Sequence, residues 1–134
     1  MSTRQTRRTR NGHKGRRVLL VGLPPLTLNA LQPALTEVAK VDAVSFPGDA
    51  FDRAAEEFDY DLVVVDVTYL DESRVRPLIT RRFLRCKPAV AYVSAGVHIR
   101  LDDLRTSQSH RLDDSSITGL VALASGSPLK LVEK

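Results

Sequence analysis

The chain has 134 residues, 43% hydrophobic and 27% charged, which is enough for one globular domain with a core of its own. No apolar stretch approaches the ~20 residues that a membrane-spanning helix needs, so the sequence argues against a membrane protein. The single cysteine, Cys86, cannot form an internal disulfide, and we therefore expect a cytoplasmic protein.

Basic residues are concentrated at the N-terminus, although the net charge of the whole chain is only +4. A block of like charge among polar residues cannot bury a core. Residues 1–17 are therefore expected to form a disordered basic arm, and residues 18–134 the folded domain. The basic residues of this arm are Arg4, Arg7, Arg8, Arg10, Lys14, Arg16 and Arg17.

Three interpretations of the arm stay open. Clustered arginines would attract nucleic acid or another anionic surface, because they release counterions from phosphates. A solvated leader without a partner is the second interpretation. Arg16 and Arg17 before apolar residues 18–23 also resemble the start of a secretory signal, but Pro24 interrupts that run early.

Strands and helices alternate along the chain as far as residue 96. Short apolar runs predict strands at 18–21, 41–46, 62–65 and 89–93. Apolar residues at helical spacing predict helices at 28–38, 49–58 and 73–86. This alternation predicts a parallel sheet covered by helices on both faces, with sites at the carboxyl ends of its strands. Asp66 and Ser94 lie at two such ends.

The pattern weakens after residue 96. Residues 101–105 are expected to form a short helix, and the polar residues 106–116 a loop. An apolar run predicts a fifth strand at 117–124. Ser127-Pro128 predicts the start of a last helix, because proline favours the first helical position.

The chain resembles the receiver domains of bacterial response regulators, in the style of the LuxR type. Asp61-Leu-Val-Val-Val-Asp66 is similar to their third strand, which ends in the phosphoacceptor aspartate. Val90-Ala-Tyr-Val-Ser94 is similar to their fourth strand, which ends in a serine or threonine that contacts the phosphoryl group. Residues 119–122 and 127–133 resemble the fifth strand and the last helix. The resemblance covers about residues 16–134 and implies an α/β, flavodoxin-like, three-layer sandwich with a five-stranded parallel sheet.

The chain departs from the receiver family where phosphoryl transfer needs charge. Receivers hold Mg²⁺ with an acidic pair after the first strand, where this sequence has Gly22, Leu23 and Pro24. The family's lysine at the end of the fifth strand corresponds to Leu123. Phosphoryl transfer depends on positioning and charge neutralisation, so we expect no working phosphotransfer, no metal and no cofactor.

The remaining candidates have structural as well as functional interpretations. Asp66 is a relic phosphoacceptor, a hydrogen-bond organiser or a residue that caps the next turn, and Ser94 is a turn residue or part of the pocket. The helix at 73–86 has a basic face that either receives an acidic partner or phosphate, or is simply solvated. This face consists of Arg76, Arg81, Arg82 and Arg85.

We therefore expect a pseudo-receiver without enzymatic activity, which regulates signalling or transcription through protein–protein contact. Homodimerisation is the simplest form of this contact. Docking is expected on the side built from the fourth helix, the fifth strand and the last helix, where apolar surface would be left uncovered. Alternatives are a DNA-associated regulator that uses the basic arm, a phosphorelay receiver modified on Asp66, and a flavodoxin-like enzyme. No glycine-rich phosphate loop supports the last of these.

Overall fold

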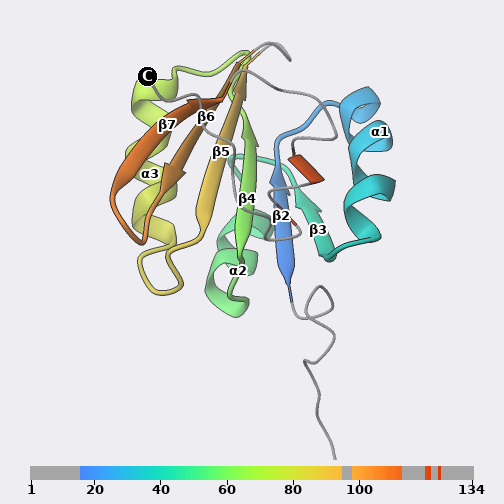
Figure 1. Cartoon of the computed structure of the whole chain (residues 1–134), viewed down its shortest axis with the longest axis horizontal. Helices are drawn as coiled ribbons and strands as arrows, with labels where there is room; N and C mark the ends of the chain where they lie inside the picture. The colour runs from blue at the N-terminus through green and yellow to red at the C-terminus, as the bar shows by residue number, and fades with distance from the viewer. Residues whose placement is uncertain (1–15, 95–97, 113–119, 122–123, 125–134) are drawn as a thin grey trace, which may run out of the picture.

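A mixed sheet, six-stranded over the described residues, forms the centre of the structure (Figure 1). The computed structural model describes residues 16–94, 98–112, 120, 121 and 124. The strand order is β3-β2-β4-β5-β6-β7, and the first four of these strands are parallel, whereas β6 and β7 are antiparallel to their neighbours. The strands are β2 (Arg17–Val21), β3 (Lys40–Val44), β4 (Leu62–Asp66), β5 (Ala89–Ser94), β6 (His98–Asp103) and β7 (Gln108–Leu112).

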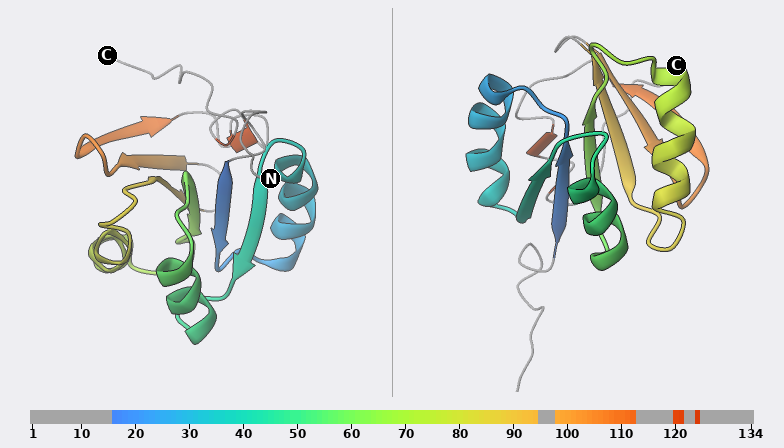
Figure 2. Two further views of the ribbon diagram at one scale, coloured as in Figure 1. Left: turned by 90° about the horizontal axis from the view of Figure 1, so that it is seen from below. Right: turned by 180° about the vertical axis from the view of Figure 1, so that it is seen from behind.

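Helices cover both faces of the sheet (Figure 2). α1 (Pro25–Thr36) lies on one face, and α2 (Asp49–Glu57) and α3 (Glu72–Arg82) lie on the other. Side chains of the central strands alternate between these faces: Leu19 packs toward α2 and α3, and Leu20 packs toward α1. Both are fully buried, which explains why the parallel strands have continuous apolar sequences.

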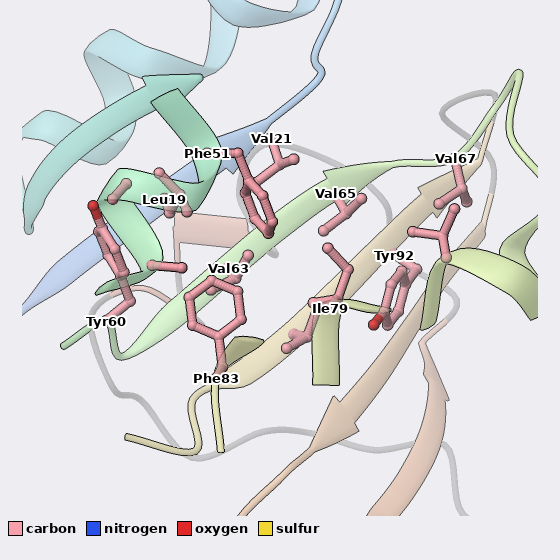
Figure 3. Close-up of a cluster of buried hydrophobic side chains, with 14 residues drawn as sticks. Leu19, Val21, Phe51, Tyr60, Val63, Val65, Val67, Ile79, Phe83 and Tyr92 are labelled. Atoms are coloured by element: carbon pink, nitrogen blue, oxygen red, sulfur yellow. The ribbon is translucent and has the colours of Figure 1, made fainter. Parts of the chain in front are cut away.

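The core on the side of α2 and α3 is rich in aromatic side chains (Figure 3). The Phe51 and Phe83 rings meet edge to face with centroids 6.0 Å apart, and Tyr60 and Phe83 do so at 6.4 Å. Aromatic pairs favour this geometry. The core on the side of α1 is aliphatic and includes Leu120 and Ala124. The parallel strands therefore lie between two layers of different chemistry.

The strands and helices predicted up to residue 94 are confirmed, with shifts at their ends. α1 begins at Pro25 rather than at 28, because proline at the first helical position loses no hydrogen bond. α3 begins after Asp71, whose carboxylate accepts a hydrogen bond from the Ser73 N–H. This helix ends at Arg82 rather than at 86, and Lys87 follows with a φ of 49°.

Residues 98–112 form an antiparallel hairpin, so the helix predicted at 101–105 is wrong, and the loop predicted at 106–116 is wrong for residues 108–112, which form β7. Leu101 is buried on the α1 side, whereas Arg100 and Asp102 form ion pairs with residues of α3 on the other side. This alternation is that of a strand. A search for apolar runs misses such a strand, because charged side chains occupy every second position.

The fifth parallel strand predicted at 117–124 is also wrong where the structure describes it. Leu120, Val121 and Ala124 are helical, and β6 pairs with β5 in place of that strand. Leu120 and Ala124 are buried four residues apart, as on one face of a helix. A short apolar run fits a buried helix as well as a buried strand, which explains the error. Leu123 and the helix predicted from residue 127 lie outside the described residues.

The turn of the hairpin provides a test of its geometry. Ser107 has a φ of 61°, and its N–H donates to the Asp103 carbonyl at 2.8 Å. For a residue with a Cβ, this left-handed conformation is roughly 1 kcal/mol less favourable than for glycine. Ser107→Gly is therefore expected to raise the free energy of unfolding by about 0.5–1 kcal/mol in urea denaturation. The control Ser109→Gly, inside β7, should lower it, and a loss of stability in both variants would contradict this turn.

Candidate functional site

The carboxyl ends of β4 and β5 bring Asp66 and Ser94 to the same edge of the sheet. Asp66 pairs in register with Val93, the residue before Ser94, and both Asp66 and Ser94 are half-buried. The Asp66 Oδ1 atom accepts a hydrogen bond from the Thr68 N–H at 2.8 Å, which closes a local turn after β4. Asp66 therefore acts in this structure as an organiser of the loop that follows its strand.

Gly22, Leu23 and Pro24 follow β2 at the same edge, and none of them supplies a carboxylate. Gly22 has a φ of 69°, and its N–H donates to the Val44 carbonyl at 2.9 Å. Pro24 is the N-cap residue of α1. An open cavity of about 410 Å³ lies here, lined by Leu20, Gly22, Leu23, Leu28, Ala43, Val44, Ser45 and Phe46. Its side chains are mostly apolar, and none of them carries a charge.

The part of the chain that the structure describes holds no group of three or more His, Cys, Asp or Glu side chains that could bind a metal ion. Asp66 is a single carboxylate, and one of its oxygens already accepts a hydrogen bond. Mg²⁺ in proteins is held through one or two carboxylates together with phosphate oxygens and several waters. The residues after β2 cannot add a second carboxylate to Asp66.

The arginines of the predicted basic face point to different parts of the fold. Arg82 Nη2 lies 2.8 Å from Asp52 on α2, and Arg85 Nη2 lies 3.1 Å from Asp59. Arg76 pairs with Asp102 on β6. Only Arg81 of the four is without a hydrogen bond or ion pair to the described residues, and its side chain is exposed. Arg76 and Arg82 therefore fasten α3 to its neighbours, Arg85 fastens the turn that follows α3, and the face is not one continuous basic surface.

Arg16 and Arg17 belong to the fold rather than to a disordered arm. Arg17 is the first residue of β2, its guanidinium lies 3.7 Å from the centroid of the Phe58 ring, and its Nε donates to Asp42 at 3.0 Å. Arg16 Nε donates to the Ala124 carbonyl at 2.8 Å. The domain boundary predicted after residue 17 is thus too late. Nucleic-acid contact by the arm stays a prediction, because its other basic residues lie outside the described ones: Arg4, Arg7, Arg8, Arg10 and Lys14.

A network of charged side chains that no sequence motif indicates lies between α3 and the β6–β7 hairpin. Asp102 is 7% exposed, and among the residues that the structure describes it is the one charged residue that is buried. Arg76 Nε donates to Asp102 Oδ2 at 3.0 Å, Arg76 Nη2 donates to Oδ1 at 3.3 Å, and Ser109 Oγ donates to Oδ1 at 2.7 Å. Arg100 extends the network by bonding to Ser109 Oγ at 3.1 Å and to Glu72 at 2.9 Å. These donors compensate the desolvation of the Asp102 carboxylate.

Tyr92 on β5 lies beside this network, at the opposite end of the aromatic core from Tyr60 (Figure 3). Its side chain is 1% exposed, and its hydroxyl has no hydrogen-bond partner among the described residues. Burial, followed by the negative charge of Asp102, raises the pKa of Tyr92 well above its ordinary value, so the hydroxyl stays protonated into the alkaline range. A buried hydroxyl without a partner is uncommon and calls for an explanation.

No family model matches this chain, and comparisons with curated proteins and with solved structures give no match. Within the described ranges, none of the helices has the length and apolar character needed to cross a bilayer.

Proposed function

We propose that this chain is a receiver-like regulatory module that acts through protein–protein contact and carries out no phosphoryl transfer. The order β3-β2-β4-β5 of its parallel strands supports the likeness, because flavodoxin-like sheets have the order 2-1-3-4-5. The likeness stops at residue 94, since an antiparallel strand, β6, takes the place of the fifth parallel strand.

The observation that carries this proposal is the composition of the edge around Asp66. The receiver family holds Mg²⁺ there with an acidic pair after the first strand, and this chain has Gly22, Leu23 and Pro24 after β2. Asp66 itself is engaged with the Thr68 N–H. Without a metal ion to neutralise it, a phosphoryl group next to Asp66 would lose most of the electrostatic stabilisation on which its transfer depends.

The same edge has exposed apolar side chains that suit contact with a protein. Leu26, in the first turn of α1, is 84% exposed, and Tyr69, in the loop after β4, is 91% exposed. Leu70 beside it is 39% exposed. These residues follow the carboxyl ends of two neighbouring strands, β2 and β4. Exposed apolar side chains at one edge of the sheet are candidates for an interface, and a second copy of the chain is the simplest partner.

A titration with Mg²⁺ and beryllofluoride, followed by proton–nitrogen NMR, tests the absence of phosphoryl chemistry. We expect no saturable shifts of the amide signals of Asp66, Thr68 and Ser94, whereas an active receiver domain under the same conditions should respond. Saturable shifts that disappear in the Asp66→Asn variant would show instead that the chain is a phosphorelay receiver.

Sedimentation analysis tests the contact surface. The double variant Leu26→Ser/Tyr69→Ser is expected to weaken self-association by roughly tenfold or more, because exposed aromatic and aliphatic anchors dominate interface energies. Leu78→Ser, on the exposed side of α3, is the matched control and should associate like the unmodified chain. A chain that stays monomeric at high concentration would rule out the homodimer.

A further inference from the structure

Two open cavities adjoin each other between α3 and the β6–β7 hairpin. They have volumes of about 320 and 560 Å³ and share Arg76, Thr80, Leu84 and Asp102, so we treat them as one α3–hairpin cleft. Cavities of this size suit small organic molecules. Further lining residues are Pro77, Arg81, Lys87, Asp103, Leu104 and Ser109.

The accessible charge in this cleft is positive. The Asp102 carboxylate is already bonded to Arg76 and Ser109 and is nearly inaccessible, with 10% of its side chain exposed. The Arg76 side chain is 35% exposed, and its Nη1 donates no hydrogen bond to the described residues. The side chains of Arg81 and Lys87 are exposed and have no polar partner in the described part of the chain. These three cationic groups have donors to spare, and they outnumber the second carboxylate of the lining, that of half-buried Asp103, so the accessible charge is positive on balance.

The cleft also has apolar walls. Leu84 is 58% exposed at the point where the two cavities meet, and Leu104 and Pro77 line one cavity each. Apolar walls with a few convergent polar groups are typical of ligand sites, because the walls supply affinity and the polar groups fix orientation. A ligand that matches both features has one anionic group and an apolar body.

The unpartnered hydroxyl of Tyr92 is the second observation that points to a ligand. Tyr92 is the cross-strand partner of Arg100, and its side chain packs on the α3 side of the sheet, so the hydroxyl lies on the same face as the network under the cleft. If the Arg76 guanidinium turned toward an anionic ligand, the Asp102 carboxylate would lose hydrogen-bond donors. Donation from the protonated Tyr92 hydroxyl to Asp102 would then offset part of the penalty of that movement.

We propose that the α3–hairpin cleft binds a small organic anion, whose carboxylate or phosphate group pairs with Arg76 and whose apolar body packs on Leu84 and Leu104. Arg81 and Lys87 attract the anion at the rim. Tyr92 acts from below as a reserve donor to Asp102. This site is separate from the Asp66 edge, and the inference does not depend on the proposed function.

Hexanoate and hexyl phosphate are suitable probes, because each has one anionic group and the same apolar chain. In NMR titrations we expect saturable shifts of Thr80, Leu84 and Ser109 amides with one or both, at roughly millimolar affinity. The stronger of the two identifies the anionic group. Hexylammonium, with the same chain and opposite charge, should give no saturable shift, and acetate should bind at least tenfold more weakly. Absence of saturable shifts with both hexyl anions would overturn the proposal, as would equal binding of hexylammonium.

Two variants test the roles of named residues. Arg81→Gln is expected to weaken binding about threefold to tenfold, whereas Arg53→Gln, which changes an exposed arginine on α2 away from the cleft, should not change it.

Tyr92→Phe removes only the unpartnered hydroxyl, so the free protein should melt at the same or a higher temperature while binding weakens roughly tenfold. Unchanged affinity in Tyr92→Phe would refute the reserve donor, and unchanged affinity in Arg81→Gln would refute the cationic rim.

Discussion

Arg76→Leu is expected to lower the free energy of unfolding by about 2–3 kcal/mol in urea denaturation at neutral pH. The substitution removes two of the three hydrogen bonds to the Asp102 carboxylate, together with its counter-charge. A carboxylate that is 7% exposed cannot recover this loss from water. The effect lies below that of a fully buried pair, because Arg76 itself is partly exposed.

A double variant separates the interaction from the side chains that make it. Arg76→Leu/Asp102→Leu should recover most of the lost stability, since two apolar side chains of similar size replace a buried ion pair at little cost. Arg82→Leu is the matched control on the same helix. It breaks a half-exposed pair with Asp52 and should cost less than about 1 kcal/mol. If Arg76→Leu costs no more than Arg82→Leu, Asp102 is not stabilised by Arg76 in the way the structure indicates.

The sequence predicts the first four strands and three helices well because each combines a strong local pattern with a clear end. The apolar run of β4 ends at Asp66, and the stripe of α2 begins directly after Pro47-Gly48. Strand and helix alternation then determines that these strands are parallel, and that Asp66 and Ser94 reach the same edge. Local pattern and topology lead to the same answer over this part of the chain.

The hairpin and the charged network cannot be predicted from local patterns, because they depend on contacts between residues far apart in the sequence. Arg100 and Asp102 look like a polar loop until their partners on α3 are known, and Asp102 lies 26 residues from Arg76. A fifth strand at 117–124, as the sequence predicts, would also occupy the place beside β5 that β6 takes in the sheet. Buried Leu101 between two charged residues is a signal for a strand. Three alternating residues are too short a pattern, however, to outweigh the polar character of the whole segment, which favours a loop.

Raising the pH above about 10 is expected to reduce stability through two buried tyrosines. Tyr60 donates from its hydroxyl to Asp42 Oδ2 at 2.9 Å, and burial, then this hydrogen bond and the Asp42 charge, raise the pKa of Tyr60 well above its ordinary value. Burial and the Asp102 charge raise the pKa of Tyr92 in the same direction. Both hydroxyls are therefore held protonated by the fold.

The sign follows from proton binding in the two states. Below the ordinary tyrosine pKa of 10 both states keep these protons, and stability is unaffected by them. Above it the unfolded chain releases them while the folded chain retains them, so the free energy of unfolding falls by up to about 1.4 kcal/mol per pH unit for each tyrosine. The fall continues until the pH reaches the raised pKa values of the folded state.

Urea denaturation at several values between pH 8 and 11.5 measures this slope, and phenylalanine variants isolate the tyrosines from other groups that titrate in alkali. Tyr60→Phe and Tyr92→Phe should each remove about half of the excess slope, and the double variant should remove nearly all of it. Tyr92→Phe discards a hydroxyl without a partner, whereas Tyr60→Phe discards one bonded to Asp42, so only the second should lose stability at neutral pH. Parallel curves for the unmodified chain and the double variant would show that neither hydroxyl is held protonated by the fold.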